Sequence, residues 1–135
     1  MGDRSLIIET VGPPGAGKST FTERLQREDG VTVSSFPYFR RLRDVPFFLR
    51  NGMAALPTLL RLNRQGGDGR LPSRDIALMI ILQGWPARLD RQAAASRQPI
   101  VLDEGPVCLM AKLQGFGAAF VSGEGAQGWW REMYG

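Results

Sequence analysis

Three short runs of aliphatic and β-branched residues in this chain have the length and composition of β-strands. The first spans residues 6–12 (LIIETVG), the second 31–35 (VTVSS) and the third 100–102 (IVL). The third run is wholly apolar, which is typical of a strand buried in a parallel sheet. A helical run at 19–28 follows the first strand, so the chain begins with a strand, a loop and a helix. This order predicts an α/β fold.

A long helical segment is predicted after the second strand. From Val45 onward, large apolar residues recur at steps of three and four, which places them on one face of a helix, with Pro57 as a kink or break. Packing of this face on the core is favoured over a contact with lipid or a partner. The residues of the face are Phe48, Leu49, Met53, Leu56, Leu59 and Leu60.

A second long helix is predicted before the third strand. It is expected to begin at Ser73 and to end near Arg97, with an interruption near Gly84 and Pro86. Its run 76–82 (IALMIIL) is apolar on all sides. This helix is therefore expected in the interior.

The most specific motif is VGPPGAGKST at residues 11–20. Its spacing matches the phosphate-binding loop, in which backbone N–H groups surround the phosphates, the lysine reaches the β and γ oxygens and the hydroxyl contacts Mg²⁺. Glycines allow backbone angles and close approaches that a Cβ obstructs, prolines stiffen the loop, and the following helix N-terminus favours an anion. The candidate phosphate-binding residues are Gly12, Pro13, Pro14, Gly15, Ala16, Gly17, Lys18, Ser19 and Thr20.

Two adjacent carboxylates, Asp103 and Glu104, follow the third strand. In phosphate-loop enzymes a strand beside the first one ends in an aspartate that holds Mg²⁺ next to the loop hydroxyl. Ser19 and Asp103 are therefore the candidate metal ligands, and Lys18, Asp103 and Glu104 the candidate catalytic residues. The alternative is that Asp103 only caps the helix that follows.

Composition narrows the classes of function. With 135 residues, of which 43% are hydrophobic, the chain suits a single soluble domain. It has no histidine and a single cysteine, Cys108, which excludes the usual zinc sites and an internal disulfide. No apolar stretch has the length needed to cross a bilayer, and no signal-peptide pattern opens the chain. A cytoplasmic protein without a membrane partner is expected.

Positive charge is concentrated in the middle of the chain. The net charge is +4, but between Arg40 and Arg74 there are eight arginines and only two acidic residues, Asp44 and Asp68. Such a segment suits phosphate or nucleic acid as a ligand, yet fifteen arginines and two lysines indicate that arginine is the ordinary surface cation here. Nucleic acid is disfavoured, since no aromatic RNA-binding motif or helix-turn-helix pattern accompanies the charge.

These motifs resemble those of the P-loop kinases of nucleosides and nucleotides, especially the thymidylate-kinase-like group that is often described only as AAA-family ATPases. The matching parts are residues 7–20 (IIETVGPPGAGKST) and 99–117 (PIVLDEGPVCLMAKLQGFG), with a second strand and about sixty helical residues between them. The resemblance implies a three-layer P-loop NTPase fold, with a parallel sheet flanked by helices. It also implies that ATP·Mg²⁺ is the phosphoryl donor and that a small-molecule acceptor binds between the second strand, the long helices and the Asp103 strand. By the same match Lys18 bridges the β and γ oxygens, and Ser19 and Asp103 hold the metal.

The chain departs from this family at the acceptor site. Thymidylate kinases carry Asp-Arg-Tyr, and deoxynucleoside kinases an Arg-Ser pair, where this chain has residues 103–106 (DEGP), so the acceptor-binding arginine is absent there. The second strand also lacks the terminal carboxylate that nucleoside kinases use as a base, which leaves Glu104 as a candidate base or as the residue that polarises water. Arg40, Arg41 and Arg43 are candidate ligands of an acceptor phosphate, or else solvated charges.

Length is the second departure. Members of the family continue through two more strands, an arginine-bearing lid and an adenine-contacting loop. Residues 1–135 are thus expected to form the N-terminal two-thirds of a longer domain, with about three strands and little or no kinase activity alone. The alternative is a reduced form of the domain whose core is exposed on one side. Trp129 and Trp130 are a candidate docking surface for a partner or a second copy. The alternatives to a kinase are an ATP-hydrolysing switch and a nucleotide-dependent binding module without turnover.

Overall fold

The computed structural model describes residues 5–28, 30–34, 41–65, 70–117 and 131. These residues belong to two compact units, each of which is assembled from two separate stretches of the chain. The first unit comprises Met1–Phe36 and Pro86–Cys108, and the second comprises Pro37–Trp85 and Leu109–Gly135. Two helices, α3 (Ser73–Ala95) and α4 (Pro106–Phe116), run from one unit into the other.

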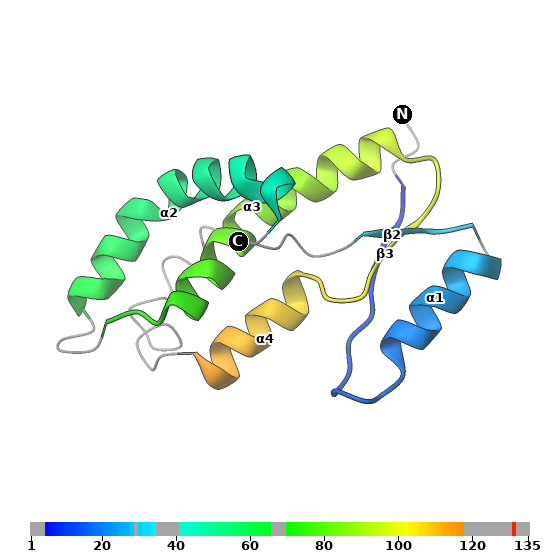
Figure 1. Ribbon diagram of the computed structural model, residues 1–135, viewed down its shortest axis with the longest axis horizontal. Coiled ribbons are helices and arrows are strands. Elements are labelled where there is room, and N and C mark those ends of the chain that lie inside the picture. Colours follow the sequence, from blue (N-terminus) through cyan, green and yellow to red (C-terminus); the bar gives the residue numbers. More distant parts are fainter. Residues whose placement is uncertain (1–4, 29, 35–40, 66–69, 118–130, 132–135) are drawn as a thin grey trace. The chain divides into compact units, whose positions relative to one another are not determined.

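The first unit is built on a small parallel sheet (Figure 1). Its elements are β1 (Ile7–Glu9), α1 (Lys18–Glu28), β2 (Thr32–Ser34) and β3 (Ile100–Leu102), together with the last part of α3 and the first turn of α4. The strand order is β1-β3-β2, and both pairings are parallel, with Val101 opposite Ile8 on one side and Val33 on the other. The expectation of an α/β fold with a parallel sheet of three strands is confirmed for the described residues.

The apolar pattern of β3 is explained by its central position. Ile100, Val101 and Leu102 are all at most 1% exposed, as expected for a strand that pairs on both edges. The predicted strand 100–102 matches the structure residue for residue, and α1 begins at Lys18, one position before the predicted start. β2 is shorter than predicted, and Ser35, its expected last residue, lies outside the described residues.

The second unit contains a short 3₁₀ turn, η1 (Leu42–Asp44), the helix α2 (Val45–Gln65), the first part of α3 and the rest of α4. The breaks predicted in the long helices are wrong, because α2 continues through Pro57 and α3 continues through Gly84 and Pro86. Both prolines are exposed, which leaves their rings in solvent.

Gly84 has a packing role instead of acting as a helix breaker. A Cβ at this position would lie 2.3 Å from Nδ2 of Asn51 and 2.6 Å from Cε2 of Phe47. Both neighbours are on α2, and the Asn51 side chain is held there by a hydrogen bond to the Phe47 carbonyl oxygen at 2.8 Å. Glycine is thus required because α2 approaches α3 at this point.

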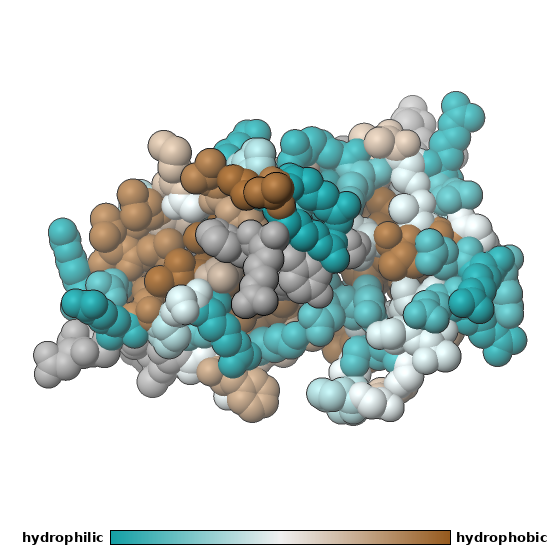
Figure 2. Space-filling model, viewed as in Figure 1, coloured by the Kyte–Doolittle hydropathy of each residue, from teal (hydrophilic) through white to brown (hydrophobic). Residues whose placement is uncertain are grey.

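The predicted core face of α2 is only partly correct. Phe48 is buried, but Leu49, Met53, Leu56 and Leu60 are exposed, and Figure 2 shows hydrophobic side chains gathered over α2. The buried positions are Phe48, Ala55 and Leu62, on a face rotated away from the predicted stripe. Because α2 is apolar around more than one face, its periodicity did not define a single buried side. The predicted burial of residues 76–82 is confirmed, since none of them is exposed.

Among the described residues, no helix combines the length and the apolar character that a membrane-spanning segment requires.

The close approach at Gly84 gives a stability prediction. We expect Gly84→Ala to lower the free energy of unfolding by about 1–3 kcal/mol, the usual cost of overpacking, because the methyl group has no room beside Asn51. Gly115 of α4 is the matched control, since a Cβ there would meet nothing within 4 Å. Gly115→Ala should be neutral, or stabilising by up to about 1 kcal/mol through helix propensity. Equal urea midpoints for the two variants would contradict this packing role.

Candidate functional site

The glycine-rich loop, Gly12–Thr20, joins β1 to α1 and requires glycine at two of its three glycine positions. Gly15 and Gly17 have φ angles of +82° and +76°, a region that side chains with a Cβ rarely adopt. A backbone hydrogen bond from Ala16 N–H to the Pro13 oxygen, at 3.2 Å, closes the turn formed by residues 13–16. Gly12 differs, because its φ is not positive and a Cβ would make only ordinary contacts, the nearest at 3.6 Å. The expectation that glycine is required at all three positions is therefore confirmed for two.

Lys18 folds back over this loop. Its ammonium group donates hydrogen bonds to the carbonyl oxygens of Gly12 at 2.8 Å and Pro13 at 3.0 Å. The first helical bond of α1 runs from Phe21 N–H to the Gly17 oxygen, so the N–H groups of the preceding residues have no partner within the helix. The positive charge and these backbone donors therefore belong to one short, exposed segment. Such a segment is suited to an anion.

Ser19 and Asp103 are in contact although 84 positions separate them in the sequence. The Ser19 hydroxyl donates to Oδ2 of Asp103 at 3.0 Å. The other carboxylate oxygen, Oδ1, is buried and has no hydrogen-bond partner among the residues that the structure describes. The contact exists because β3, which precedes Asp103, pairs with β1, which leads into the glycine-rich loop. The prediction that Asp103 lies beside the loop hydroxyl is confirmed.

Two residues at the end of β1 attach the segment around Asp103 to the sheet, and the sequence analysis did not identify either. The Thr10 hydroxyl donates to the Leu102 oxygen at 3.0 Å and to the Asp103 oxygen at 3.3 Å. The Glu9 carboxylate accepts backbone N–H bonds from Gly105 at 3.1 Å, Val107 at 3.0 Å and Cys108 at 2.8 Å.

Glu9 is the capping group of α4. The helix starts at Pro106 and is preceded by a glycine, so neither residue supplies a capping side chain. A carboxylate at a helix N-terminus satisfies free N–H groups and interacts favourably with the helix dipole, a term of about 0.3–1 kcal/mol at exposed sites. The alternative assigned to Asp103, that it only caps the following helix, is therefore wrong: the cap comes from Glu9, whereas Asp103 accepts from Ser19.

The remaining candidate residues are less closely tied to this centre. Glu104 is half-buried in the bend after Asp103. Arg41 and Arg43 are exposed and belong to the second unit. Arg40, Trp129 and Trp130 lie outside the described residues.

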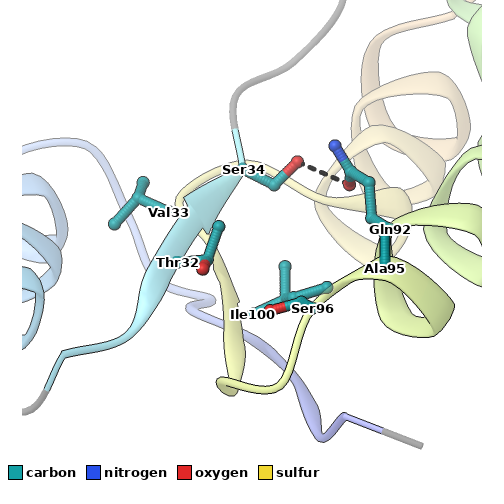
Figure 3. Close-up of a pocket in the computed structure, with 7 residues that line it drawn as sticks. All are labelled: Thr32, Val33, Ser34, Gln92, Ala95, Ser96 and Ile100. Atoms are coloured by element: carbon teal, nitrogen blue, oxygen red, sulfur yellow. Dashed lines mark hydrogen bonds between the residues drawn. The ribbon is translucent and has the colours of Figure 1, made fainter.

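A hollow of about 330 Å³ lies between β2 and the end of α3 (Figure 3). Ser34 is buried beside it and donates its hydroxyl to Oε1 of Gln92 at 2.9 Å. Among the described residues, the lining of the hollow consists of hydroxyl, amide and aliphatic groups without an ionisable side chain: Thr32, Val33, Ser34, Gln92, Ala95, Ser96 and Ile100. The chemistry of this hollow suits a neutral molecule better than an anion.

Within the described part of the chain, no group of three or more histidine, cysteine, aspartate or glutamate side chains could hold a metal ion. A cation at this site would therefore need ligands from a bound molecule and from water in addition to Ser19 and Asp103.

No family model matches the chain, and neither the curated proteins nor the solved structures contain a match to it.

The backbone of the loop predicts different costs for its glycines. We expect Gly17→Ala to lower the free energy of unfolding by about 1–2 kcal/mol, because an alanine is strained at a φ of +76°. Gly12→Ala serves as the control and should leave stability unchanged or slightly increased, since its φ is ordinary and its new methyl group is not crowded. The measurement is chemical unfolding without nucleotide, and equal losses in both variants would refute the loop geometry.

Proposed function

We propose that this chain binds a nucleoside triphosphate, ATP, together with Mg²⁺, and that it contributes this binding site to a P-loop kinase that transfers a phosphoryl group to a small acceptor. The single observation that carries the proposal is the contact of 3.0 Å between Ser19 Oγ and Asp103 Oδ2, at the ends of paired parallel strands. A chance glycine-rich turn would have no reason to place its hydroxyl against an aspartate 84 positions away. The parallel order β1-β3-β2 is compatible with the P-loop NTPase fold that the sequence resemblance implies.

The phosphates would lie in the glycine-rich loop. Positive φ angles at Gly15 and Gly17 are typical of loops in which successive backbone N–H groups face an anion, which supports a phosphate site here. Lys18 holds its ammonium group at the same loop through two neutral carbonyl oxygens. Charged phosphate oxygens are stronger acceptors than these carbonyls, so a bound triphosphate would draw Lys18 toward its β and γ oxygens.

The oxygen pair of Ser19 and Asp103 fits Mg²⁺. Octahedral Mg²⁺ binds its ligands at about 2.0–2.1 Å, which sets adjacent ligand oxygens about 3 Å apart. The observed separation between Ser19 Oγ and Asp103 Oδ2 is 3.0 Å, and the second, buried oxygen of Asp103 has no partner within the described part of the chain. Mg²⁺ usually keeps several waters and takes one or two protein ligands plus substrate phosphates, so two protein oxygens suffice. When bound, the metal would neutralise charge that develops on the β and γ phosphates.

The candidate residues for the acceptor site follow from the positions at which the sequence departs from the kinase family that it resembles. Glu104 adjoins the metal ligand and is our candidate for the base that accepts the proton of an acceptor hydroxyl. The hollow beside Ser34 and Gln92 is our candidate for part of the acceptor site, since its lining of hydroxyl, amide and aliphatic groups suits an uncharged molecule. Arg41 and Arg43, with Arg40, remain the candidate ligands of an acceptor that carries a phosphate.

The second candidate function is ATP hydrolysis, which the adjacent Asp103 and Glu104 favour. In that case Glu104 would orient water instead of an acceptor hydroxyl. A nucleotide-dependent binding module would use the same loop and metal without turnover. Product formation distinguishes the three: a kinase consumes ATP faster with its acceptor, an ATPase requires only water, and a binding module consumes none.

The loop lysine supports the first functional prediction. We expect Lys18→Ala to weaken ATP binding about 10- to 100-fold, the equivalent of about 1.5–3 kcal/mol for a lost charge-assisted hydrogen bond. Isothermal titration calorimetry with Mg²⁺ measures the effect. Lys112→Ala is the control, because it removes the chain's other lysine, which lies on α4, and should leave the affinity unchanged. Equal affinities for Lys18→Ala and the parent would refute the proposed triphosphate site.

The adjacent carboxylates are expected to have separate effects. Asp103→Asn keeps the shape of the side chain but removes its charge, so the gain in ATP affinity on adding Mg²⁺ should be lost. Glu104→Gln should retain that gain but reduce turnover by about 100-fold or more, the usual contribution of a positioned base. Titrations with Mg²⁺ and with EDTA, followed by ADP measurements with and without candidate acceptors, test both. An Asp103→Asn protein with unchanged Mg²⁺ dependence would mean that Asp103 is not a metal ligand.

A further inference from the structure

The first turn of α4 depends on a distant residue for its hydrogen bonds. Pro106 has no N–H, so the donors available around the helix start are those of Gly105, Val107 and Cys108. All three donate to the carboxylate of Glu9, two to Oε1 and one to Oε2. One side chain from β1 therefore satisfies the whole start of the helix.

The same end of β1 also holds the other side of the bend. Thr10 N–H donates to the Leu102 oxygen at 2.9 Å, and the Thr10 hydroxyl reaches the oxygens of Leu102 and Asp103. Asp103 and Glu104 thus lie between two attachments. Thr10 binds the carbonyl oxygens at the start of the bend, and Glu9 binds the backbone N–H groups that follow it. Both attachments come from consecutive residues, Glu9 at the end of β1 and Thr10 directly after it.

Gly105 is required by this arrangement. A Cβ at Gly105 would lie 2.6 Å from Cδ of Glu9 and 2.7 Å from its Oε2. Its φ is not in the left-handed region, so the need for glycine comes from the close approach of Glu9 and not from backbone strain. The chain therefore leaves a space that the Glu9 carboxylate fills.

We infer that Glu9 is the positioning residue that holds Asp103 against Ser19, an inference that rests on the proposed role of Asp103 as a magnesium ligand. The strand that carries Glu9 also leads directly into the glycine-rich loop. Because one strand anchors both the loop and the Asp103 bend, the two oxygens of the metal site are aligned by the same three residues of β1 and their neighbour Thr10. In this role Glu9 would not be a ligand of the phosphates or the metal, because its two carboxylate oxygens accept the backbone N–H groups of Gly105, Val107 and Cys108, and it would act only through the bend.

The test uses Glu9→Gln, which keeps the size of the side chain but replaces one acceptor oxygen by an NH₂ group and removes the charge. We expect the Mg²⁺ concentration that gives half of the gain in ATP affinity to rise about tenfold. The affinity for ATP in EDTA should stay within twofold of the parent, because the glycine-rich loop is untouched. A merely structural role would weaken both affinities together. Glu23→Gln on the exposed side of α1 is the matched control and should change neither value.

A double-mutant cycle tests whether Gly105 affects the metal site through its close contact with Glu9. Gly105→Ala alone should raise the Mg²⁺ midpoint, the concentration that gives half of the gain in ATP affinity, because the new methyl group displaces Glu9. In a Glu9→Ala background the same substitution should add little, since the space that it needs has been vacated. Additive effects of Gly105→Ala and Glu9→Ala would overturn the inference.

The remaining outcomes separate this inference from the proposed function. If the parent binds ATP with Mg²⁺ and Glu9→Gln shows a midpoint within twofold of the parent, the role of Glu9 is refuted and the function stands. If the parent shows no Mg²⁺-dependent ATP binding, the proposed function and the role of Glu9 both fail. Should Glu9→Gln not fold, as judged by circular dichroism, Glu9→Asp replaces it, because it keeps the charge and shortens the reach by one methylene. A Glu9→Asp midpoint equal to that of the parent likewise refutes the inference.

Discussion

The parallel pairing of β1 with β3 is the constraint on which the whole site depends. In parallel strands the carboxyl ends lie at the same edge of the sheet, so the loop after β1 and the bend after β3 begin side by side. The register places Glu9 opposite Leu102, and the residues that directly follow these two strands are Thr10 and Asp103. If β3 were to slip by one residue, the side chain of Asp103 would turn away from Ser19, because alternate residues of a strand point to opposite faces.

The pairing alone does not orient a side chain beyond the end of a strand, and three-residue strands offer few ladder bonds to resist fraying. Hydrogen bonds from side chains supply the missing restraint here. Glu9 and Thr10 continue the attachment of β1 to the β3 segment for six residues beyond Leu102, as far as Cys108. The bend that contains Asp103 and Glu104 is thereby fixed at both of its ends. This restraint favours a single orientation of the Asp103 carboxylate.

The features predictable from sequence were those whose signal is local. The apolar run 100–102 and the strand, loop and helix around Gly12–Thr20 each depend on neighbouring residues, and the structure contains them. The contact between Ser19 and Asp103 was predictable only from what is general for phosphate-loop enzymes, in which a strand that ends in an aspartate pairs with the strand before the loop. The buried face of α2 and the continuity of α3 at Gly84 were mispredicted, because each is decided by what packs on the helix. The spacing of apolar residues does not specify which of several apolar faces meets a neighbour.

The role of Glu9 was missed although the sequence carries a signal for it. A helix that begins with Gly105 and Pro106 has no side chain of its own to bond its first N–H groups, and buried N–H groups are rarely left unsatisfied. An uncapped helix start therefore predicts a capping group from elsewhere in the chain. The donors are backbone amides and the helix N-terminus is positive, so that group should be a carboxylate or another strong acceptor. A carboxylate in β1, in a position otherwise expected to be apolar, meets this requirement. The missing information was the strand pairing, which converts a separation of 96 residues between Glu9 and Gly105 into one hydrogen bond.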